Sequence, residues 1–251
     1  MLAIDLFCGL GGWTEGLLAE GYDVVGFDIE RHDYGTGGYP AQLVLQDILT
    51  LHGRQFKDAA LIVASPPCQE FSYMAMPWSK AKAKERDLLE CRDDPKRLTA
   101  LFDACFRIQR EASEAAGRKI PLVVENVCGA QKWVGRAKWH YGSFYLWGDV
   151  PALMPIVVKR TAMKYGVTHR SDGSTHFHKA PSGIKGVPHK PTGHWTNPAE
   201  TGTKQGGDRF GSSTPGSLCS YSSKSNSRKA ASAMIAKIPF ELAKHVAAMW
   251  R

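Results

Sequence analysis

Residues 1–28 read MLAIDLFCGLGGWTEGLLAEGYDVVGFD, which is two apolar runs on either side of a glycine cluster and a periodic segment. The first run, Leu2–Phe7, stops at the glycines, and apolar residues then recur at helical spacing up to Gly21. The second run, Val24–Ile29, has the composition of a buried strand. This stretch therefore predicts a strand, a glycine turn, a helix and a second strand.

The same alternation continues along the chain. Leu61–Ala64 and Leu122–Glu125 are short apolar runs that end in polar or proline residues, as buried strands do. Between them, Pro95–Ala116 has apolar residues on one face at helical spacing. A helix that bridges two strands implies that the strands are parallel, so the sequence predicts a doubly wound α/β fold with a mostly parallel sheet. Ligands bind beyond the carboxyl ends of the strands in such folds.

Composition excludes several classes of protein. The chain has 251 residues, 43% of them hydrophobic, in runs too short to span a membrane, and its N-terminus leads into a strand rather than a signal peptide. Its six cysteines include no CxxC pair, so neither a disulfide framework nor a thiolate zinc site is indicated. His176 and His178 lack a companion pair at zinc spacing, and we expect no metal. These features favour a protein of the reducing cytoplasm.

The positive charge is concentrated in one segment. The whole chain carries a net charge of +8, which divides into −3 for residues 1–155, +9 for residues 156–229 and +2 for residues 230–251. The basic segment is also rich in Gly, Ser, Thr, Pro and His and poor in periodic apolar residues. Such a composition is typical of an irregular module that faces a polyanion, or of a disordered basic linker.

The glycine turn predicts a nucleoside cofactor. Glycines within Asp5–Gly12 allow a sharp turn and a close approach of the backbone to a ligand, and Asp28 at the end of the next strand suits ribose hydroxyls. Thr14 stands where the dinucleotide pattern GxGxxG has its third glycine, which argues against a nicotinamide-dependent oxidoreductase. A tight turn without a ligand is the alternative interpretation.

Two further motifs lie at predicted strand ends. In Ser65–Ser72, two prolines fix the backbone before Cys68, which is placed to act as a nucleophile rather than as a buried apolar residue. Glu125-Asn126-Val127 puts a carboxyl group and an amide at the same predicted edge, where Glu125 suits proton sharing with a base nitrogen. The sequence thus predicts a cysteine, a carboxyl group and a glycine turn around one ligand.

These three motifs, in this order and spacing, resemble those of the DNA cytosine-C5 methyltransferases. Gln46-Asp47-Ile48 is similar to the family's acidic adenine-contacting motif, and Ile235–Ala243 to its C-terminal motif. The resemblance implies a fold of the S-adenosylmethionine-dependent, Rossmann-like methyltransferase type. It also implies methyl transfer from S-adenosylmethionine to C5 of a cytosine flipped out of duplex DNA.

The resemblance assigns roles to individual residues. Cys68 adds to C6 of the cytosine, Glu125 binds N3 and the exocyclic amine, and Asn126 braces the catalytic loop. Arg136 is the candidate catalytic arginine, because the family's QxRxR motif is only roughly matched here. The residues expected at the cofactor are Asp5, Phe7, Gly9, Gly11, Gly12, Asp28, Ile29, Asp47, Ile48 and Pro66.

The resemblance also divides the chain. Residues 1–149 are expected to form the cofactor-binding catalytic domain, 150–229 a small irregular basic target-recognition domain, and 230–251 a C-terminal helix that returns to the catalytic domain. Residues 70–90 are the expected catalytic loop, in which Lys80, Lys82 and Lys84 suit phosphates or a solvated helix start. A monomer acting on double-stranded DNA is expected, in a bacterial or phage-infected cell.

The sequence is also compatible with two other functions. One branch of the same family methylates tRNA, although that branch lacks a sizeable recognition domain. A catalytically inactive DNA-binding protein on the same fold is favoured by Ala236-Lys237-Ile238-Pro239, which departs from the family's Gly-Asn-x-Val-Pro. It leaves the intact motifs around Cys68 and Glu125 unexplained.

Overall fold

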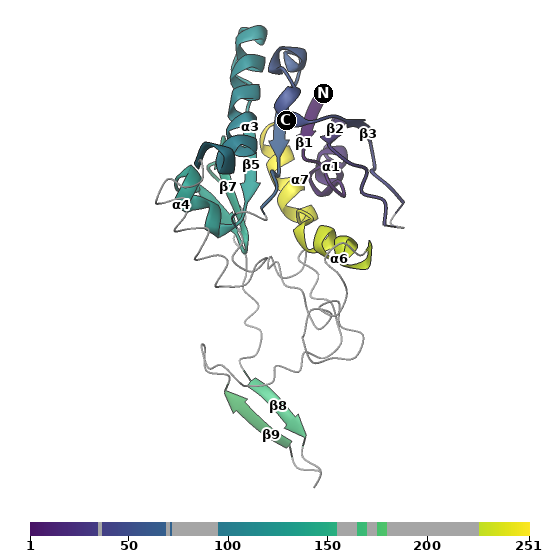
Figure 1. Cartoon of the computed structure of the whole chain (residues 1–251), viewed down its shortest axis with the longest axis vertical. Coiled ribbons are helices and arrows are strands. Elements are labelled where there is room, and N and C mark those ends of the chain that lie inside the picture. The colour runs from purple at the N-terminus through teal and green to yellow at the C-terminus, as the bar shows by residue number, and fades with distance from the viewer. Residues whose placement is uncertain (35–36, 69–70, 72–94, 155–164, 170–174, 180–225) are drawn as a thin grey trace.

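The structure is a computed structural model that describes residues 1–34, 37–68, 71, 95–154, 165–169, 175–179 and 226–251 of the chain (Figure 1). The helices and short 3-10 turns (η) are α1 (Gly12–Ala19), η1 (Ile48–Thr50), η2 (Gly53–Phe56), α3 (Pro95–Ala116), η3 (Cys128–Ala130), α4 (Gln131–Val134), α6 (Asn226–Ala236) and α7 (Phe240–Met249). The strands are β1 (Leu2–Leu6), β2 (Asp23–Asp28), β3 (Gln42–Leu45), β4 (Leu61–Ala64), β5 (Leu122–Asn126), β6 (Trp139–Tyr141), β7 (Phe144–Gly148), β8 (Tyr165–His169) and β9 (Thr175–Lys179).

Seven strands form one mixed sheet in the order β3-β2-β1-β4-β5-β7-β6. The first five strands of this order are parallel to one another, and β7 runs antiparallel to both β5 and β6. The predicted α/β fold with a mostly parallel sheet is therefore confirmed. β8 and β9 pair with each other in a separate antiparallel sheet.

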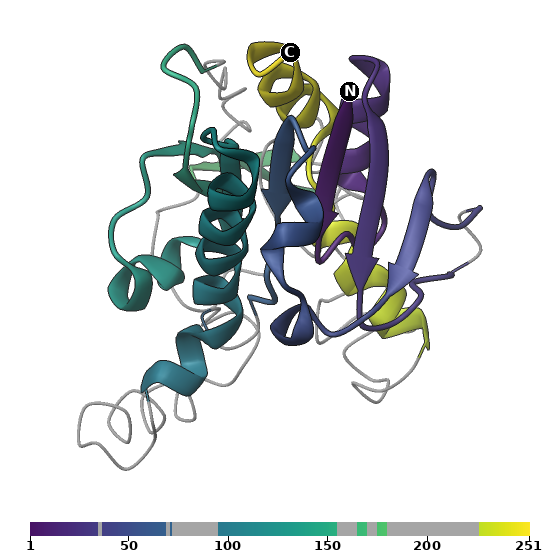
Figure 2. The ribbon, with the colours of Figure 1, turned by 90° about the horizontal axis from the view of Figure 1, so that it is seen from above.

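Helices cover both faces of the large sheet (Figures 1 and 2). On one face, α3 buries Phe102, Cys105 and Ile108 in a cluster with residues of β1, β4 and β5, as its helical apolar face predicts. On the other face, α1 and α7 bury Trp13 and Leu242 against the opposite side of the same strands. Each buried strand thus has apolar side chains on both faces, which explains its continuous apolar run.

Close packing of α1 on the C-terminal helices brings the end of the chain to the glycine turn. A Cβ atom on Gly12 would lie 2.5 Å from the backbone nitrogen of Ile238, and one on Gly16 would lie 2.4 Å from that of Lys244. Two glycines on one face of α1 therefore permit this approach. The Lys237 ammonium lies 2.5 Å from the Glu15 carboxylate across the same contact.

Several elements differ from the sequence prediction. Residues 226–251 contain two helices rather than the single helix expected over 230–251, because Pro239 stands at the N-cap of α7 and interrupts the first helix. The hairpin of β6 and β7 and the short strand β3 were not predicted. Of the expected catalytic loop 70–90, only Phe71 is among the described residues, and most of the expected recognition domain 150–229 lies outside them. In the described part of the chain, no helix combines the length and hydropathy needed to span a membrane.

Candidate active site

The predicted motifs meet at one edge of the sheet, where the parallel strands end. β1 leads into Phe7–Gly12, β2 ends at Asp28, β4 leads into Pro66–Cys68, and β5 ends at Glu125 and Asn126. The strand order reverses at β1, whose neighbours are β2 and β4. The motifs after β1 and β4 therefore flank the topological switch point, which is where open α/β sheets bind their ligands.

Three residues with positive φ shape the turn after β1, namely Phe7 at 58°, Gly9 at 50° and Gly11 at 76°. Phe7 is the one non-glycine residue with positive φ in the described part of the chain. A left-handed conformation costs such a residue about 1–2 kcal/mol, so surrounding contacts must maintain it. Cys8 supplies one of them, because its backbone N–H donates to the carbonyl of Phe27 at 3.1 Å.

Asp28 fastens the glycine turn to the end of β2. Its carboxylate accepts hydrogen bonds from the backbone N–H groups of Gly9 at 2.9 Å and Ile29 at 2.8 Å, and His32 lies 3.4 Å away. Burial raises the pKa of Asp28, but the hydrogen bonds from His32, Gly9 and Glu30 outweigh burial and hold the pKa below its usual range. The contact with Asp28 in turn raises the pKa of His32. Asp28 is thus an ionised acceptor at the predicted ribose position.

The residues expected around an adenine differ in exposure. Ile29 follows Asp28 and is 73% exposed, so its side chain is open to a ligand. Asp47 follows β3, next to the end of β2, and its carboxylate caps η1 by accepting from the Leu49 N–H at 2.9 Å. Ile48 was also expected at the cofactor, but its side chain is 2% exposed and packs in the core with Phe27. Ile48 therefore packs in the core beneath this edge of the sheet.

The segment that carries Cys68 is held from two sides. The side-chain amide of Asn126 donates to the Pro66 carbonyl at 3.0 Å, and Asn126 is fully buried. From the other side, the indole N–H of Trp13 donates to the Ser65 hydroxyl at 2.9 Å. These two contacts join the segment to β5 and to α1. Cys68 at its end is half-buried and forms no disulfide.

Glu125 and Arg136 have opposite environments. Glu125 is 3% exposed and lies opposite the buried Leu146 of β7. Ala64 at the end of β4 is paired with Val124, so the cysteine segment and Glu125 leave the sheet side by side. Arg136 is exposed on the loop between α4 and β6. The structure thus brings Cys68, Glu125 and Asn126 to adjacent strand ends.

Two contacts at this edge were missed by sequence reasoning. Tyr39 enters from the segment between β2 and β3, and its hydroxyl lies 2.5 Å from that of Thr14, which bonds the Asp5 carboxylate at 2.7 Å. The Trp13–Ser65 bond joins residues 52 positions apart. A signal for Tyr39 does exist in Gly26, a glycine in the middle of a buried strand, because such a glycine marks the close approach of another group.

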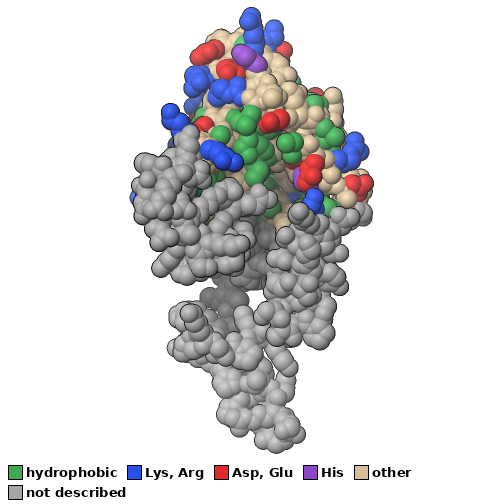
Figure 3. All heavy atoms as spheres, in the orientation of Figure 1, with side chains coloured by type: hydrophobic (Ala, Val, Ile, Leu, Met, Phe, Trp, Pro, Cys, Tyr) green, Lys and Arg blue, Asp and Glu red, His purple; other side chains and the backbone are tan. Residues whose placement is uncertain are grey.

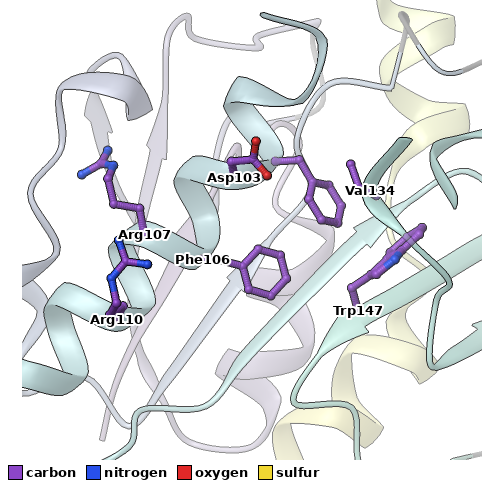
Figure 4. A pocket seen from close by; sticks show the side chains of 7 residues that line it. Asp103, Phe106, Arg107, Arg110, Val134 and Trp147 are labelled. Atoms are coloured by element: carbon purple, nitrogen blue, oxygen red, sulfur yellow. The ribbon is translucent and has the colours of Figure 1, made fainter. Parts of the chain in front are cut away.

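A surface pocket lies away from this edge. It has a volume of about 480 Å³ between α3, α4 and β7, and Phe106, Val134 and Trp147 face one another across it (Figure 4). Arg107 and Arg110 line its side on α3. None of the predicted site residues lines the pocket, so the hollow is separate from the chemistry of the strand ends.

Comparison with known families tests the resemblance directly. The model of the family described as C-5 cytosine-specific DNA methylase matches residues 1–90, which include the glycine turn, Asp28 and Cys68. The chain resembles the DNA cytosine-C5 methyltransferases, as its motifs predict. This family is one of S-adenosylmethionine-dependent methyltransferases. The remainder of the chain, with Glu125 and Asn126, lies outside the matched range.

Solved structures give weaker likenesses. A protein described as a DNA modification methyltransferase encoded within a prophage of E. coli is 23% identical, with a TM-score of 0.34 over 52% of this chain and 33% of that one. The Dnmt2 methyltransferase of S. pombe is 18% identical, with a TM-score of 0.34 over 54% and 37%. The Entamoeba histolytica methyltransferase EhMeth is 18% identical, with a TM-score of 0.34 over 54% and 40%. The match thus spans 33% to 40% of each of these proteins.

Curated proteins give no match to the chain. Metal binding was tested on the structure itself. Over the described ranges, no three His, Cys, Asp or Glu side chains come together in a group that could hold a metal ion.

Proposed function

We propose that this chain transfers a methyl group from S-adenosylmethionine to C5 of a cytosine in duplex DNA, through a covalent adduct of Cys68. The observation that carries the proposal is the meeting of Cys68 and Glu125 at adjacent strand ends, with Asn126 bonded to Pro66 between them. A thiol and a buried carboxyl group beside a glycine turn suit addition to a base better than hydride transfer, which leaves Cys68 without a role.

The residues present fit the cofactor. Asp28 is an ionised acceptor for ribose hydroxyls, and Ile29 offers an exposed apolar surface to an adenine. In the turn from Phe7 to Gly12, Gly9 faces open space that suits the methionine part. Asp5 has a buried carboxylate oxygen, Oδ1, without a hydrogen-bond partner in the described structure. When bound, S-adenosylmethionine supplies an electrophilic methyl group.

The chain's own residues perform the steps on the base. The Cys68 thiolate adds to C6 of cytosine, which moves an electron pair to C5 and makes that carbon nucleophilic. Glu125 holds N3 and the exocyclic amine and stabilises the enamine as it forms. After C5 is methylated, a base removes its proton, the C5–C6 double bond returns, and Cys68 leaves as thiolate. The bond of Asn126 to Pro66 fixes the origin of the loop throughout.

We further propose the division into a catalytic domain at 1–149, a target-recognition domain at 150–229 and a C-terminal segment at 230–251. The packing of α7 on α1 supports the return of the C-terminal segment to the cofactor site. The net charge of +9 over 156–229 supports contact with DNA phosphates. Action as a monomer in a bacterial or phage-infected cell completes this proposal.

A transfer assay tests the proposal. Purified protein with methyl-tritiated S-adenosylmethionine is expected to label duplex DNA of mixed sequence, and the label is expected in 5-methylcytosine. Bisulfite sequencing of a methylation-deficient host that expresses the chain then gives the sequence context. Unmodified tRNA serves as the competing substrate. Label in tRNA alone would overturn the choice of DNA, and cofactor and DNA binding without label in either substrate would indicate an inactive binding protein.

A second surface supports a nucleic-acid substrate. Residues 127–148 contain no acidic residue, three basic residues and six aromatic ones, of which all but Phe144 and Trp147 lie outside the buried core, although residues 1–155 are net negative. Lys132 lies 5.2 Å from the ring of Trp133, Trp139 is 39% exposed, and the rings of His140 and Tyr145 stack at 5.0 Å. On the described part of the face in Figure 3, exposed hydrophobic side chains lie among Lys, Arg, Asp and Glu side chains. Basic and aromatic groups together suit phosphates and bases.

The double substitution Arg136→Ala/Lys138→Ala tests this surface. Each lost phosphate contact is expected to reduce the slope of log K against log salt by about 0.9, so two contacts reduce it by about 1.8. Fluorescence anisotropy of a labelled duplex between low and high salt measures the slope. The matched control is Arg54→Ala/Lys57→Ala, because these two basic residues are also exposed but belong to the segment before β4. Equal slopes for the two double variants would contradict the assignment.

A further inference from the structure

The ring of Tyr39 occupies the space that a side chain at position 26 would fill. A Cβ atom on Gly26 would lie 2.2 Å from the Tyr39 hydroxyl oxygen and 2.4 Å from the ring carbon that bears it. Gly26 is paired with Asp5 across β2 and β1, so the tyrosine ring reaches the row of the sheet that contains Asp5. Because Gly26 of the buried strand β2 has no side chain, the ring of Tyr39 from the following loop fits at this position.

The hydroxyl groups of Tyr39 and Thr14 form a directed chain to Asp5. Thr14 donates its single hydroxyl proton to Oδ2 of Asp5 at 2.7 Å. When Asp5 is ionised, the contact of 2.5 Å between the two hydroxyl oxygens is therefore a donation from Tyr39 to Thr14. Burial raises the pKa of Tyr39, which keeps the phenol protonated and able to donate. These two hydrogen bonds polarise each other in one direction, from Tyr39 in the loop through Thr14 to the Asp5 carboxylate.

Among the described residues, the groups that chiefly act on Asp5 include no positively charged side chain. Asp5 is fully buried, and its second oxygen, Oδ1, has no hydrogen-bond partner in the described part of the chain. The titratable or polar groups that face it are Thr14 from α1, Asp28 from β2, the neutral thiol of Cys8 from the glycine turn, and Tyr39. Burial, with a smaller contribution from the Asp28 charge, raises the pKa of Asp5 to about 7.

We propose that Tyr39 is a positioning residue of the cofactor site, which acts through Thr14 to orient the Asp5 carboxylate and keep it ionised for a cationic cofactor. The proposal rests on the proposed use of S-adenosylmethionine, whose sulfonium and ammonium groups carry positive charge. Without the Tyr39 hydroxyl, Thr14 is a weaker donor and Asp5 holds its proton to higher pH. Tyr39 thereby links the segment between β2 and β3 to affinity for the cofactor.

Titration calorimetry of S-adenosylmethionine binding between pH 6 and pH 9 tests this role without requiring catalysis. Wild-type affinity is expected to rise with pH through the titration of Asp5, because the ionised carboxylate attracts the cation. Tyr39→Phe is expected to weaken binding about fivefold near pH 7, the effect of one lost hydrogen bond, and to move the midpoint to higher pH. Thr14→Ser keeps the hydroxyl group and is expected to retain the wild-type midpoint.

Tyr22→Phe is the matched control. It also removes one buried tyrosine hydroxyl, which bonds the Ala247 carbonyl at 3.2 Å, but that contact anchors α7 instead of Asp5. A wild-type midpoint is expected for this variant. Gly26→Ala displaces the Tyr39 ring and is expected to reproduce the upward shift of Tyr39→Phe. An unchanged midpoint in Tyr39→Phe would overturn the proposal.

Thermal unfolding without cofactor separates this proposal from the proposed function. The folded protein holds the Asp5 proton more tightly than the unfolded chain, so this carboxyl stabilises most at low pH, and its contribution declines from about pH 4 until about pH 7. Tyr39→Phe is expected to extend the decline to higher pH, and Asp5→Asn to remove it. If wild type fails to bind S-adenosylmethionine but Tyr39→Phe still extends the decline of stability to higher pH, the proposed cofactor is wrong and the link from Tyr39 to Asp5 is supported. If wild type binds S-adenosylmethionine but Tyr39→Phe leaves the decline of stability unchanged, only the proposed role of Tyr39 is refuted.

Discussion

Cys68→Ala is expected to abolish methyl transfer, with a loss of about 10³-fold or more, while binding of DNA and S-adenosylmethionine persists. The substitution removes the sulfur that adds to C6, and without that addition C5 of cytosine is too weak a nucleophile to accept the methyl group. The thiol is half-buried and makes no disulfide, so alanine leaves the fold intact. Transfer of tritiated methyl groups to a duplex under single-turnover conditions measures the effect.

The covalent step has its own readout. A duplex that carries 5-fluorocytosine at the target is expected to trap wild type as a denaturation-resistant adduct, because fluorine at C5 cannot leave as the proton does. Cys68→Ala forms no such adduct. The matched control is Cys128→Ala, since Cys128 is exposed and lies just beyond the end of the neighbouring strand β5. Turnover above a tenth of wild type in Cys68→Ala, or loss of trapping in Cys128→Ala, would refute the role of Cys68.

The sequence predicted well those helices and strands whose own apolar pattern matches the side chains that they bury. Pro95–Ala116 was expected as one helix and is observed with those bounds, because its apolar face is regular and Gly117 follows with φ 65°. Leu61–Ala64 was expected as a strand because it is a short apolar run, and in the structure all four of its residues are buried in β4. In both cases local periodicity and tertiary position agree.

Elements that depend on a partner were missed. β3 has only four residues, and none of them is fully buried, so its apolar pattern is weak. β7 owes its place to contacts with distant residues, since the backbone N–H of Asp149 donates to Leu122 and Gln109 bonds the Asp149 carboxylate. Such pairing is set by contacts across tens of residues rather than by the hairpin's own sequence.

The candidate site divides in the same way. Its motifs were predicted because parallel strands end at one edge, so residues that follow β1, β4 and β5 must lie near one another. The supporting contacts were mostly not predicted. Tyr39 and Thr14 are 25 positions apart, and Tyr39 follows a loop without periodicity, so only the packing of the folded chain joins them. Arg136 was assigned from a diverged motif, and its catalytic role stays a prediction. The structure shows only that it is exposed on the loop between α4 and β6.

Glu125→Gln is the second substitution with a large expected effect. Glutamine keeps the shape of the side chain at a position that is 3% exposed, so folding and cofactor affinity are expected to persist. It cannot share a proton with N3 of cytosine, which leaves the enamine poorly stabilised after Cys68 adds to C6. The single-turnover rate is expected to fall about 10²–10⁴-fold, the range typical of acid–base groups.

The control for this substitution is another carboxyl group with a structural role. Glu111 accepts a hydrogen bond from the Gly53 N–H and pairs with Arg107 on the far side of α3, where hydrogen bonding to Gly53 lowers its pKa below the usual range despite partial desolvation. Glu111→Gln is therefore expected to lower thermal stability and leave the rate unchanged, because the amide loses the charge that these donors stabilise. An unchanged rate in Glu125→Gln at saturating cofactor would exclude proton sharing at N3. Loss of DNA binding with an unchanged rate in bound complexes would instead assign Glu125 to recognition of the base.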